Sequence, residues 1–284
     1  MEVSGSKSGL PPVNTRGNPD LEPETSNSFS YGVVWQPSFV RGLDLTADYW
    51  EIDIDNVITS IAYGTIMNNC VNASGGPDMG YCQFVHRHTT SGEGHLVGEV
   101  DYVQAQYANL AGRKTRGIDF GAQYRFDLGP GSYRLAFTGT RNLERRIISQ
   151  RGSEGTDRAG QFQYPDFKAN LMNRYDVGQF SFALNTRYTS KGLYSATDQS
   201  METRELPWVP EYWQHDLNVS WYPTAGYSIS LGVKNLADTQ IKHPVLRAYT
   251  TSPHLTADSA NANYGANYMD AIGRYYFVTL KADF

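Results

Sequence analysis

The stretch Phe180-Ser181-Phe182-Ala183-Leu184-Asn185-Thr186-Arg187-Tyr188 sets mostly apolar even positions against small or polar odd ones. Successive side chains of a β-strand point to opposite faces, so this pattern predicts a strand with one apolar face and one wet face. The same period of two recurs at 227–235 and 213–221, on odd positions, and at 118–126, on even positions. The chain is therefore predicted to be an all-β protein.

Segments of this kind are too long for an ordinary globular protein. Nine of them cover residues 27–37, 43–54, 113–127, 131–145, 162–176, 178–192, 211–223, 226–238 and 270–284. Globular strands average about 5–6 residues, whereas a tilted membrane-spanning strand needs roughly 9–11. The lengths favour an antiparallel transmembrane β-barrel over a soluble sandwich, and residues 99–109 are predicted to extend the third strand above the membrane.

The connections between these segments alternate between short and long. The short ones, 38–42, 128–131, 176–179 and 223–226, are rich in Gly, Pro and Asp, as tight hairpins require. The long ones lie near 55–112, 146–161, 193–210 and 239–269. Short turns at one end and long loops at the other are typical of outer-membrane barrels, whose turns are periplasmic and whose loops are extracellular.

Bulk composition agrees with a barrel and excludes other classes. The mean hydropathy is −0.49 and no run of 18 apolar residues occurs, so no transmembrane helix is predicted. Aromatic residues, among them Tyr31, Trp35, Trp213 and Trp221, gather near segment ends, as in the aromatic girdles of membrane barrels. A net charge of −5 without a basic stripe argues against a nucleic-acid partner. The first 25 residues do not form a signal peptide, so we expect that a signal lies on sequence outside this chain.

The last segment has the pattern of a membrane strand that ends in phenylalanine. Tyr276, Val278, Leu280 and Phe284 share its apolar face. This arrangement resembles the C-terminal signal that the barrel assembly machinery reads in outer-membrane proteins.

Three further motifs resemble one family, the TonB-dependent outer-membrane receptors. Residues 18–26, Asn-Pro-Asp-Leu-Glu-Pro-Glu-Thr-Ser, are similar to the segment that leads from an extracellular loop into a strand in that family. Residues 113–120 and 233–238 are similar to two of its strand motifs, and all three follow in the family order. The resemblance implies an extracellular loop segment at 1–26 and, at 27–284, the C-terminal nine or so strands of a plugged barrel of about 22 strands.

The resemblance also implies a function and a set of partners. It implies active uptake of a scarce nutrient such as an iron-siderophore, a vitamin or a glycan, across the bacterial outer membrane. The plug, the remaining strands and the segment that binds TonB would come from a separate chain or a missing segment. Membrane lipid, lipopolysaccharide and the assembly machinery are further expected partners. With a periplasmic C-terminus, an odd number of strands places the N-terminal segment outside the cell.

Cys70 and Cys82 lie in the first long loop, and they are either unrelated thiols or, in an oxidising compartment, a disulfide. The loop after Tyr49–Ile54 resembles that of family members with a loop disulfide, which favours the bond. Two cysteines are too few for a zinc site, and His86 and His88 add only a weak signal. No metal site and no cofactor is predicted.

Loop aromatics are the candidates for ligand binding, because aromatic rings can stack on sugars or chelate rings. They are Tyr63, Tyr81, Tyr194, Trp208, Tyr249 and Tyr264. The alternative is that these rings pack the loops on one another. The loop histidines 86, 88, 95, 243 and 254 are candidates for contact with a metal complex, although scattered loop histidines are usually solvated.

No catalytic constellation is apparent. Glu51, Asp53 and Asp55 alternate near a strand top without a nucleophile or a histidine beside them. They are interpreted as acids on a polar wall that faces the lumen, and the chain is predicted not to be an enzyme. The alternatives are a passive channel or adhesin barrel, which would lack a plug upstream, and a soluble β-sandwich binding module, which would partition into water without detergent.

Overall fold

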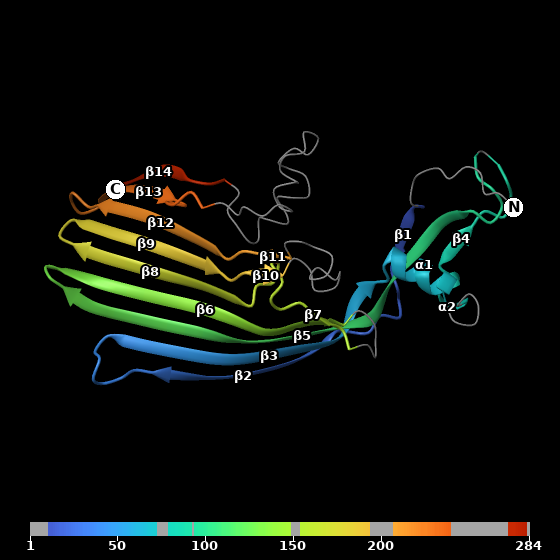
Figure 1. The fold of residues 1–284 in the computed structure, drawn as a ribbon, viewed down its shortest axis with the longest axis horizontal. Helices are drawn as coiled ribbons and strands as arrows, with labels where there is room; N and C mark the ends of the chain where they lie inside the picture. The colour runs from blue at the N-terminus through green and yellow to red at the C-terminus, as the bar shows by residue number, and fades with distance from the viewer. Residues whose placement is uncertain are drawn as a thin grey trace. The chain divides into compact units, whose positions relative to one another are not determined.

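The computed structural model describes residues 11–72, 79–92, 94–148, 154–193, 207–239 and 272–282. Strands dominate this part of the chain, together with two short helices, α1 (Tyr63–Asn72) and α2 (Met79–Cys82) (Figure 1). In the described ranges, neither helix has the length and hydropathy needed to cross a membrane.

All nine predicted strands are present in the structure. They are β2 (Thr25–Trp35), β3 (Leu43–Ser60), β5 (Val100–Leu128), β6 (Gly131–Ile148), β8 (Phe167–Val177), β9 (Phe180–Thr189), β12 (Tyr212–Trp221), β13 (Tyr227–Lys234) and β14 (Tyr275–Ala282). The shorter strands are β1 (Val13–Arg16), β4 (Val85–Arg87), β7 (Thr156–Asp157), β10 (Gly192–Leu193) and β11 (Trp208–Val209). The period of two therefore identified the long strands correctly.

The long strands form a meander in which each pairs with the next long strand along the chain. Their order in the sheet is β14-β13-β12-β9-β8-β6-β5-β3-β2. The registers from β6 to β14 are antiparallel, and β8 and β9 meet in a hairpin that pairs Val177 with Phe180. Gly178 in this hairpin has a φ of 55°, a left-handed conformation that glycine adopts without steric cost.

The chain divides into two compact units. One, here called the loop unit, comprises Met1–Ser26, Ile54–Arg113 and Ile148–Glu154. The other, the barrel unit, comprises Asn27–Asp53, Lys114–Ile147 and Gly155–Phe284. The chain passes from one unit to the other near the start of β2, within β3, within β5 and at the end of β6.

Burial in the barrel unit is the reverse of that in a water-soluble sheet. On β12, Gln214, Asp216 and Ser220 are buried, whereas Trp213 and Trp221 are 46% and 40% exposed. The register matches Trp221 with Phe180 and Val219 with Phe182, so the apolar side chains of neighbouring strands share one face. Hydrocarbon solvates such a face and water does not, which is the pattern of a lipid-facing barrel wall.

The loop unit instead has a core of the kind found in water-soluble proteins. Ile66, Cys70, Val85 and Val103 are buried together. Partly buried apolar residues surround them, namely Ile61, Tyr63, Met67, Tyr81, Cys82, Phe84 and Val100. This unit therefore follows the ordinary rule of burying apolar surface away from water.

Several boundaries differ from those predicted. The range 55–112, predicted as a loop, contains the end of β3, both helices, β4 and the start of β5, whose predicted extension over 99–109 is confirmed. Within 1–26, β1 pairs in parallel with Val103–Gln106 of β5. β1 and β4 have only four and three residues, which is too short for an alternating pattern to show in the sequence.

The reversed burial predicts opposite responses at two adjacent positions of β13. Leu231 is 58% exposed on the apolar face, whereas Ser230 lies on the opposite face, where its Oγ is 2.7 Å from Ser220 Oγ. In the full-length protein, Leu231→Lys should lower the free energy of unfolding from lipid vesicles by about 2–4 kcal/mol, the cost of a lysine facing mid-bilayer lipid. Ser230→Lys should cost clearly less in the same urea titration. Equal losses would show that the face is not in contact with hydrocarbon.

Candidate functional site

A buried carboxylate ties three strands together on the polar face of the barrel unit. The side chain of Asp216, on β12, is only 7% exposed. Its Oδ2 accepts hydrogen bonds from Arg187 Nη2 of β9 at 2.9 Å and from Lys234 Nζ of β13 at 3.0 Å. Its Oδ1 accepts from the backbone N–H of Asn235 at 2.9 Å. The two cations and the N–H compensate the desolvation of the carboxylate, which would otherwise be costly.

Asn235 fixes the point at which the chain leaves β13. Its side chain is fully buried, its Nδ2 donates to Thr239 O at 3.0 Å, and its Oδ1 accepts from Thr239 N at 2.8 Å. Its φ is 49°, a left-handed value that asparagine tolerates better than most residues. Three residues on, Asp238 Oδ1 accepts from the N–H of Arg274, just before β14. The motif at 233–238 therefore joins the two ends of the connection that follows β13.

The motif at 18–26 has a similar role in the loop unit. The side chain of Asn109, on β5, bonds to the Glu22 backbone as a neighbouring strand would. Its Oδ1 accepts from Glu22 N at 2.8 Å, and its Nδ2 donates to Glu22 O at 2.8 Å. Asn18 Nδ2 donates to Tyr107 O, and the Glu24 carboxylate accepts from Ile58 N at 2.7 Å. Side-chain hydrogen bonds thus hold the segment beside β5 where regular pairing is absent.

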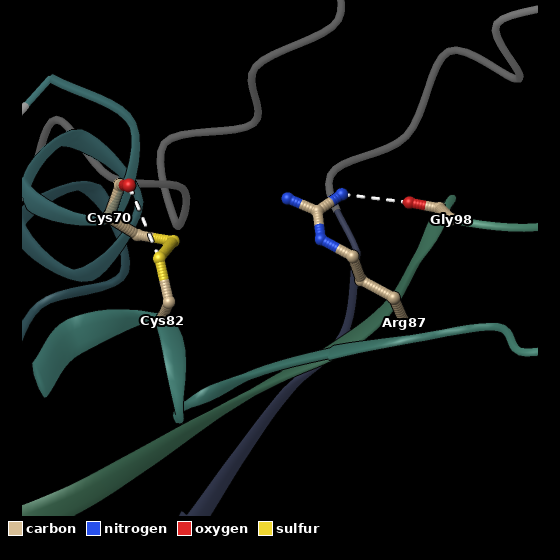
Figure 2. The surroundings of a disulfide bond; sticks show 4 residues. All are labelled: Cys70, Cys82, Arg87 and Gly98. Atoms are coloured by element: carbon tan, nitrogen blue, oxygen red, sulfur yellow. Dashed lines mark hydrogen bonds between the residues drawn. A yellow bond between two sulfur atoms is a disulfide. The ribbon is translucent and has the colours of Figure 1, made fainter. Parts of the chain in front are cut away.

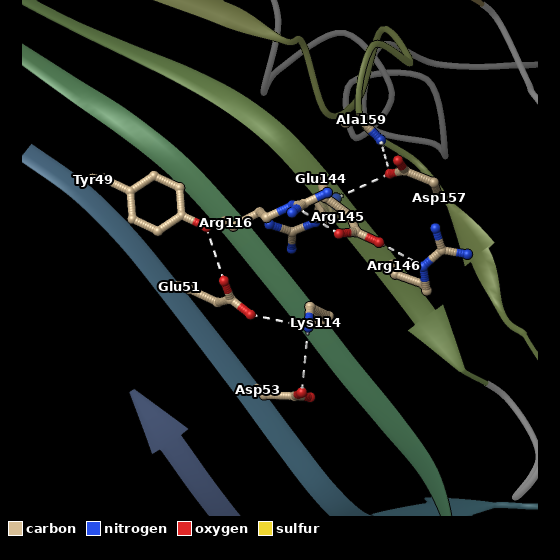
Figure 3. A network of polar contacts seen from close by, with 10 residues as sticks. All are labelled: Tyr49, Glu51, Asp53, Lys114, Arg116, Glu144, Arg145, Arg146, Asp157 and Ala159. Atoms are coloured by element: carbon tan, nitrogen blue, oxygen red, sulfur yellow. Dashed lines mark hydrogen bonds and ion pairs between the residues drawn. The ribbon is translucent and has the colours of Figure 1, made fainter. Parts of the chain in front are cut away.

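A chain of charged side chains crosses β3, β5 and β6 (Figure 3). Lys114 Nζ lies 2.9 Å from Glu51 Oε1 and 3.8 Å from Asp53 Oδ2. The Tyr49 hydroxyl donates to Glu51, and Arg116 pairs with Glu144, which also pairs with Arg146. No nucleophile joins these groups among the described residues, so they form an ion-pair network rather than an acid–base pair.

These acids lie on a different face from the one predicted. The Tyr49 ring packs against Tyr31 at 5.3 Å, and Tyr31 belongs to the exposed apolar face of β2. Glu51 and Asp53 follow Tyr49 at intervals of two and therefore share its face. The prediction of a lumen-facing acidic wall is wrong for Glu51 and Asp53. It failed because the outward face changes from apolar to charged within one strand.

A cavity of about 570 Å³ lies in the barrel unit between the ends of β6, β8 and β9 and the β10–β11 pair. Its lining combines cations, an acid and aromatic rings, chiefly Arg141, Asp166, Phe167, Tyr188, Lys191 and Trp208. Lys191 Nζ lies 5.1 Å from the centre of the Trp208 ring, within cation–π distance. Such a lining suits a ligand with both polar groups and a flat apolar face.

The predicted disulfide is present. Cys70 at the end of α1 bonds to Cys82 at the end of α2, within the core of the loop unit (Figure 2). Nearby, Arg87 of β4 donates to Gly98 O at 2.8 Å, which closes the hairpin between β4 and β5 (Figure 2). The crosslink therefore joins two helices that are each too short to be stable in isolation.

The histidines of the loop unit pack as rings rather than forming a metal site. His86 stacks on Tyr102 at 4.3 Å, and His88 stacks on His95 at 3.7 Å, with His88 3.6 Å from Asp101. Over the described ranges, no group of three or more His, Cys, Asp or Glu residues is arranged to hold a metal ion. His243 and His254 lie outside the described residues.

The predicted ligand-binding aromatics that the structure describes belong to different units. Tyr63 and Tyr81 pack against the core of the loop unit, whereas Trp208 lines the cavity of the barrel unit. Tyr194, Tyr249 and Tyr264 lie outside the described residues. Arg141 and Lys191, the cations of the cavity, were not predicted, because isolated basic residues near strand ends give no pattern in the sequence.

The final strand has the predicted alternation. Tyr276, Val278 and Leu280 of β14 are all highly exposed on one face, while Phe284 lies outside the described residues. Assembly signalling by this strand stays a prediction.

Comparison with known proteins agrees with this geometry. A family model described as TonB dependent receptor-like, beta-barrel, matches residues 3–236. The ferric enterobactin receptor of Pseudomonas aeruginosa, in a complex with enterobactin, is similar to the chain with a TM-score of 0.60 at 17% identity, covering 95% of this chain and 33% of the receptor. The siderophore receptor PirA of Acinetobacter baumannii gives a TM-score of 0.57 at 17% identity, with the same coverage of both chains. No curated protein matches the chain in sequence.

The meander, the reversed burial and the solved neighbours define part of the wall of an outer-membrane-type β-barrel. The chain belongs to the family of TonB-dependent receptor β-barrels. It spans about a third of the length of the solved receptors it resembles. Barrels of this family lie in the bacterial outer membrane, and its receptors are transporters, which agrees with the prediction that the chain is not an enzyme.

Removing the disulfide should loosen the loop unit selectively. Replacing both Cys70 and Cys82 by Ser in the full-length protein should speed proteolytic cleavage between Tyr63 and Cys82, because a short crosslink typically contributes about 2–4 kcal/mol. The barrel unit has no part in the bond, so heat-modifiable migration on gels should be unchanged. Reductant should reproduce the effect in the wild type and add nothing in the double variant; a wild type indifferent to reductant would contradict the assignment.

Substitutions of Asn235 should separate its two roles. Asn235→Gly loses the side-chain hydrogen bonds and should cost about 1–3 kcal/mol in urea unfolding of the full-length receptor. Asn235→Ala should cost about 1–2 kcal/mol more, because alanine disfavours a φ of 49°. Asn218→Ala, at a half-buried position of β12, serves as a control with a loss of about 1 kcal/mol or less. Equal stability of the glycine variant and the wild type would refute the anchoring role.

Proposed function

We propose that the chain is the C-terminal barrel part of a TonB-dependent receptor that takes up an iron-siderophore complex. The observation that carries this proposal is the family match over residues 3–236, which coincides with the strand meander and its outward apolar face. The siderophore class is suggested by the printed functions of two solved neighbours, a ferric enterobactin receptor and a siderophore receptor. At 17% identity those neighbours establish the fold alone, so the substrate class rests on a functional test.

The division into short and long connections supports an orientation. Tight turns join β5 to β6, β8 to β9 and β12 to β13 at one end of the strands, and the long connections leave from the other end. We place the turns and the C-terminus in the periplasm and the long connections outside the cell, as in other membrane barrels. Residues 1–26 and the loop unit are then extracellular, where an oxidised Cys70–Cys82 pair is expected to persist.

The proposed transport needs parts beyond this chain. β2 and β14 end the path of the described strands, and hydrocarbon cannot satisfy unpaired strand edges. We propose that the remaining strands, a plug and the TonB-binding segment come from a separate chain or a further segment of the same protein. The barrel assembly machinery, membrane lipid and lipopolysaccharide are further proposed partners.

The ligand is proposed to meet aromatic rings of the extracellular connections. Tyr194, Tyr249 and Tyr264 are the candidates in connections that leave the extracellular end of the strands. Tyr63 and Tyr81 are weaker candidates, because both rings are partly buried against the core of the loop unit.

Uptake by cells distinguishes this function from the alternatives. The full-length receptor, expressed in cells that lack their own siderophore receptors, should accumulate radioactive iron from a ferric siderophore, and deletion of TonB or collapse of the proton-motive force should abolish the accumulation. Accumulation that persists without TonB, together with steady conductance in planar bilayers, would indicate a passive channel. Energised uptake of a vitamin or glycan, and not of iron, would refute the substrate class alone.

A further inference from the structure

The cavity near Trp208 opens on the outward face of the barrel unit. The register pairs Arg141 of β6 with Phe167 of β8, and Tyr188 of β9 with Trp213 of β12. The rings of Phe167 and Tyr188 lie 6.0 Å apart, and those of Tyr188 and Trp213 lie 4.4 Å apart. Tyr188 follows Phe180 and Phe182 at even intervals and therefore shares their exposed apolar face. The side chains that line the cavity from β6, β8 and β9 thus point away from the lumen.

The inward face at the same height is lined by other residues. Lys168, next to Phe167, pairs with Thr140 and Thr189. Alternation places all three on the face that carries Asp216 and Arg187. A ligand on its way through the lumen would meet Lys168 and its neighbours and not Arg141. The cavity is therefore separate from the transport path.

The cavity lies where the outward surface changes from apolar to charged. On β3, Tyr49 is followed on the same face by Glu51, and on β5, Ile118 gives way to Arg116. On β6, Phe137 and Gly139 are followed on the same face by Arg141. This residue lies in the half of β6 that is farther from the short turn before Gly131. Rings with a polar tip followed by charges mark the level at which hydrocarbon ends and headgroups begin.

The side chains of the cavity match a phosphorylated sugar. Arg141 and Lys191 are cations that suit phosphate. The Arg141 side chain is 55% exposed, although its Nη2 lies 3.7 Å from Asp166 Oδ2. Trp208 offers a ring face to a sugar, while Asp166, Gln161 and Glu211 offer groups that bond to hydroxyls. The presence of acids beside the cations argues against a bare polyanion and for a ligand with both hydroxyl and phosphate groups.

We propose that this cavity binds the phosphorylated sugar headgroup of the glycolipid of the outer leaflet, lipopolysaccharide. The proposal rests on the orientation given under the proposed function, in which the ends of β6 and β8 at the cavity are extracellular. It does not depend on which nutrient the receptor takes up. Arg141 and Lys191 hold the phosphate, Trp208 packs on the sugar, and the acyl chains run down the apolar face below Tyr188.

Native mass spectrometry of the full-length receptor tests the proposal. The purified protein in detergent is titrated with rough-type lipopolysaccharide that carries phosphate on its headgroup sugars. The double variant Arg141→Ala with Lys191→Ala should bind about tenfold more weakly or worse, since it loses two charge-assisted contacts. The matched control Lys168→Ala removes a cation at the same height on the inward face and should bind within about twofold of the wild type. Equal weakening by the control would overturn the site.

Two further arms complete the experiment. Exchange of the two cations, Arg141→Lys with Lys191→Arg, keeps the charge and should retain most binding, which excludes misfolding as the cause of a loss. Enzymatically dephosphorylated glycolipid should bind the wild type about as weakly as intact glycolipid binds the double alanine variant; undiminished binding would refute the phosphate role. Inorganic phosphate at millimolar concentration should not compete, and competition would point to a free anion instead of a lipid.

Iron uptake separates this proposal from the proposed function. The double alanine variant should still accumulate iron in the energised assay, because its residues face away from the lumen. Loss of uptake together with loss of glycolipid binding would assign the cavity to transport and overturn the proposal. Failure of the wild type to take up iron, with glycolipid binding intact, would refute the siderophore assignment and leave the glycolipid site standing.

Discussion

The structure depends on one constraint, namely that hydrocarbon offers no hydrogen bonds to a backbone. Every strand must therefore pair with a neighbour along its whole membrane span, and the simplest way to do so is to pair each strand with the next one in the chain. The meander from β2 to β14 follows this rule. The same solvent turns apolar side chains outward, so polar groups collect on the inner face. There the Asp216 carboxylate pairs with Arg187 and Lys234.

Where strands leave the sheet, polar side chains form the hydrogen bonds to backbone groups that a neighbouring strand would otherwise form. Asn235 and Asp238 do this after β13, and Asn109 does it for the segment at 18–26. Two of the motifs by which the chain resembles its family coincide with these points. A side-chain amide carries a donor and an acceptor in the geometry of a peptide group, which is why asparagine recurs at such positions.

The sequence predicted the barrel unit well because lipid imposes a period of two that survives without any tertiary information. It predicted the loop unit poorly: α1, α2 and the parallel pairing of β1 follow from packing around Ile66 and Val103, which no local pattern reports. The outward direction of Glu51 was missed because it depends on where the bilayer ends. Arg141 and Lys191 line the same cavity only because of the register of β6, β8 and β9. Their common position could therefore not be predicted from the sequence.

The crosslink between Cys70 and Cys82 has a consequence for biosynthesis. With the loop unit outside the cell, as proposed, the nearest oxidising compartment on the export route is the periplasm. If the bond closes there before the strands enter the membrane, the segment between β3 and β5 crosses with residues 70–82 closed into a loop. The assembling barrel must then offer an opening wide enough for that loop.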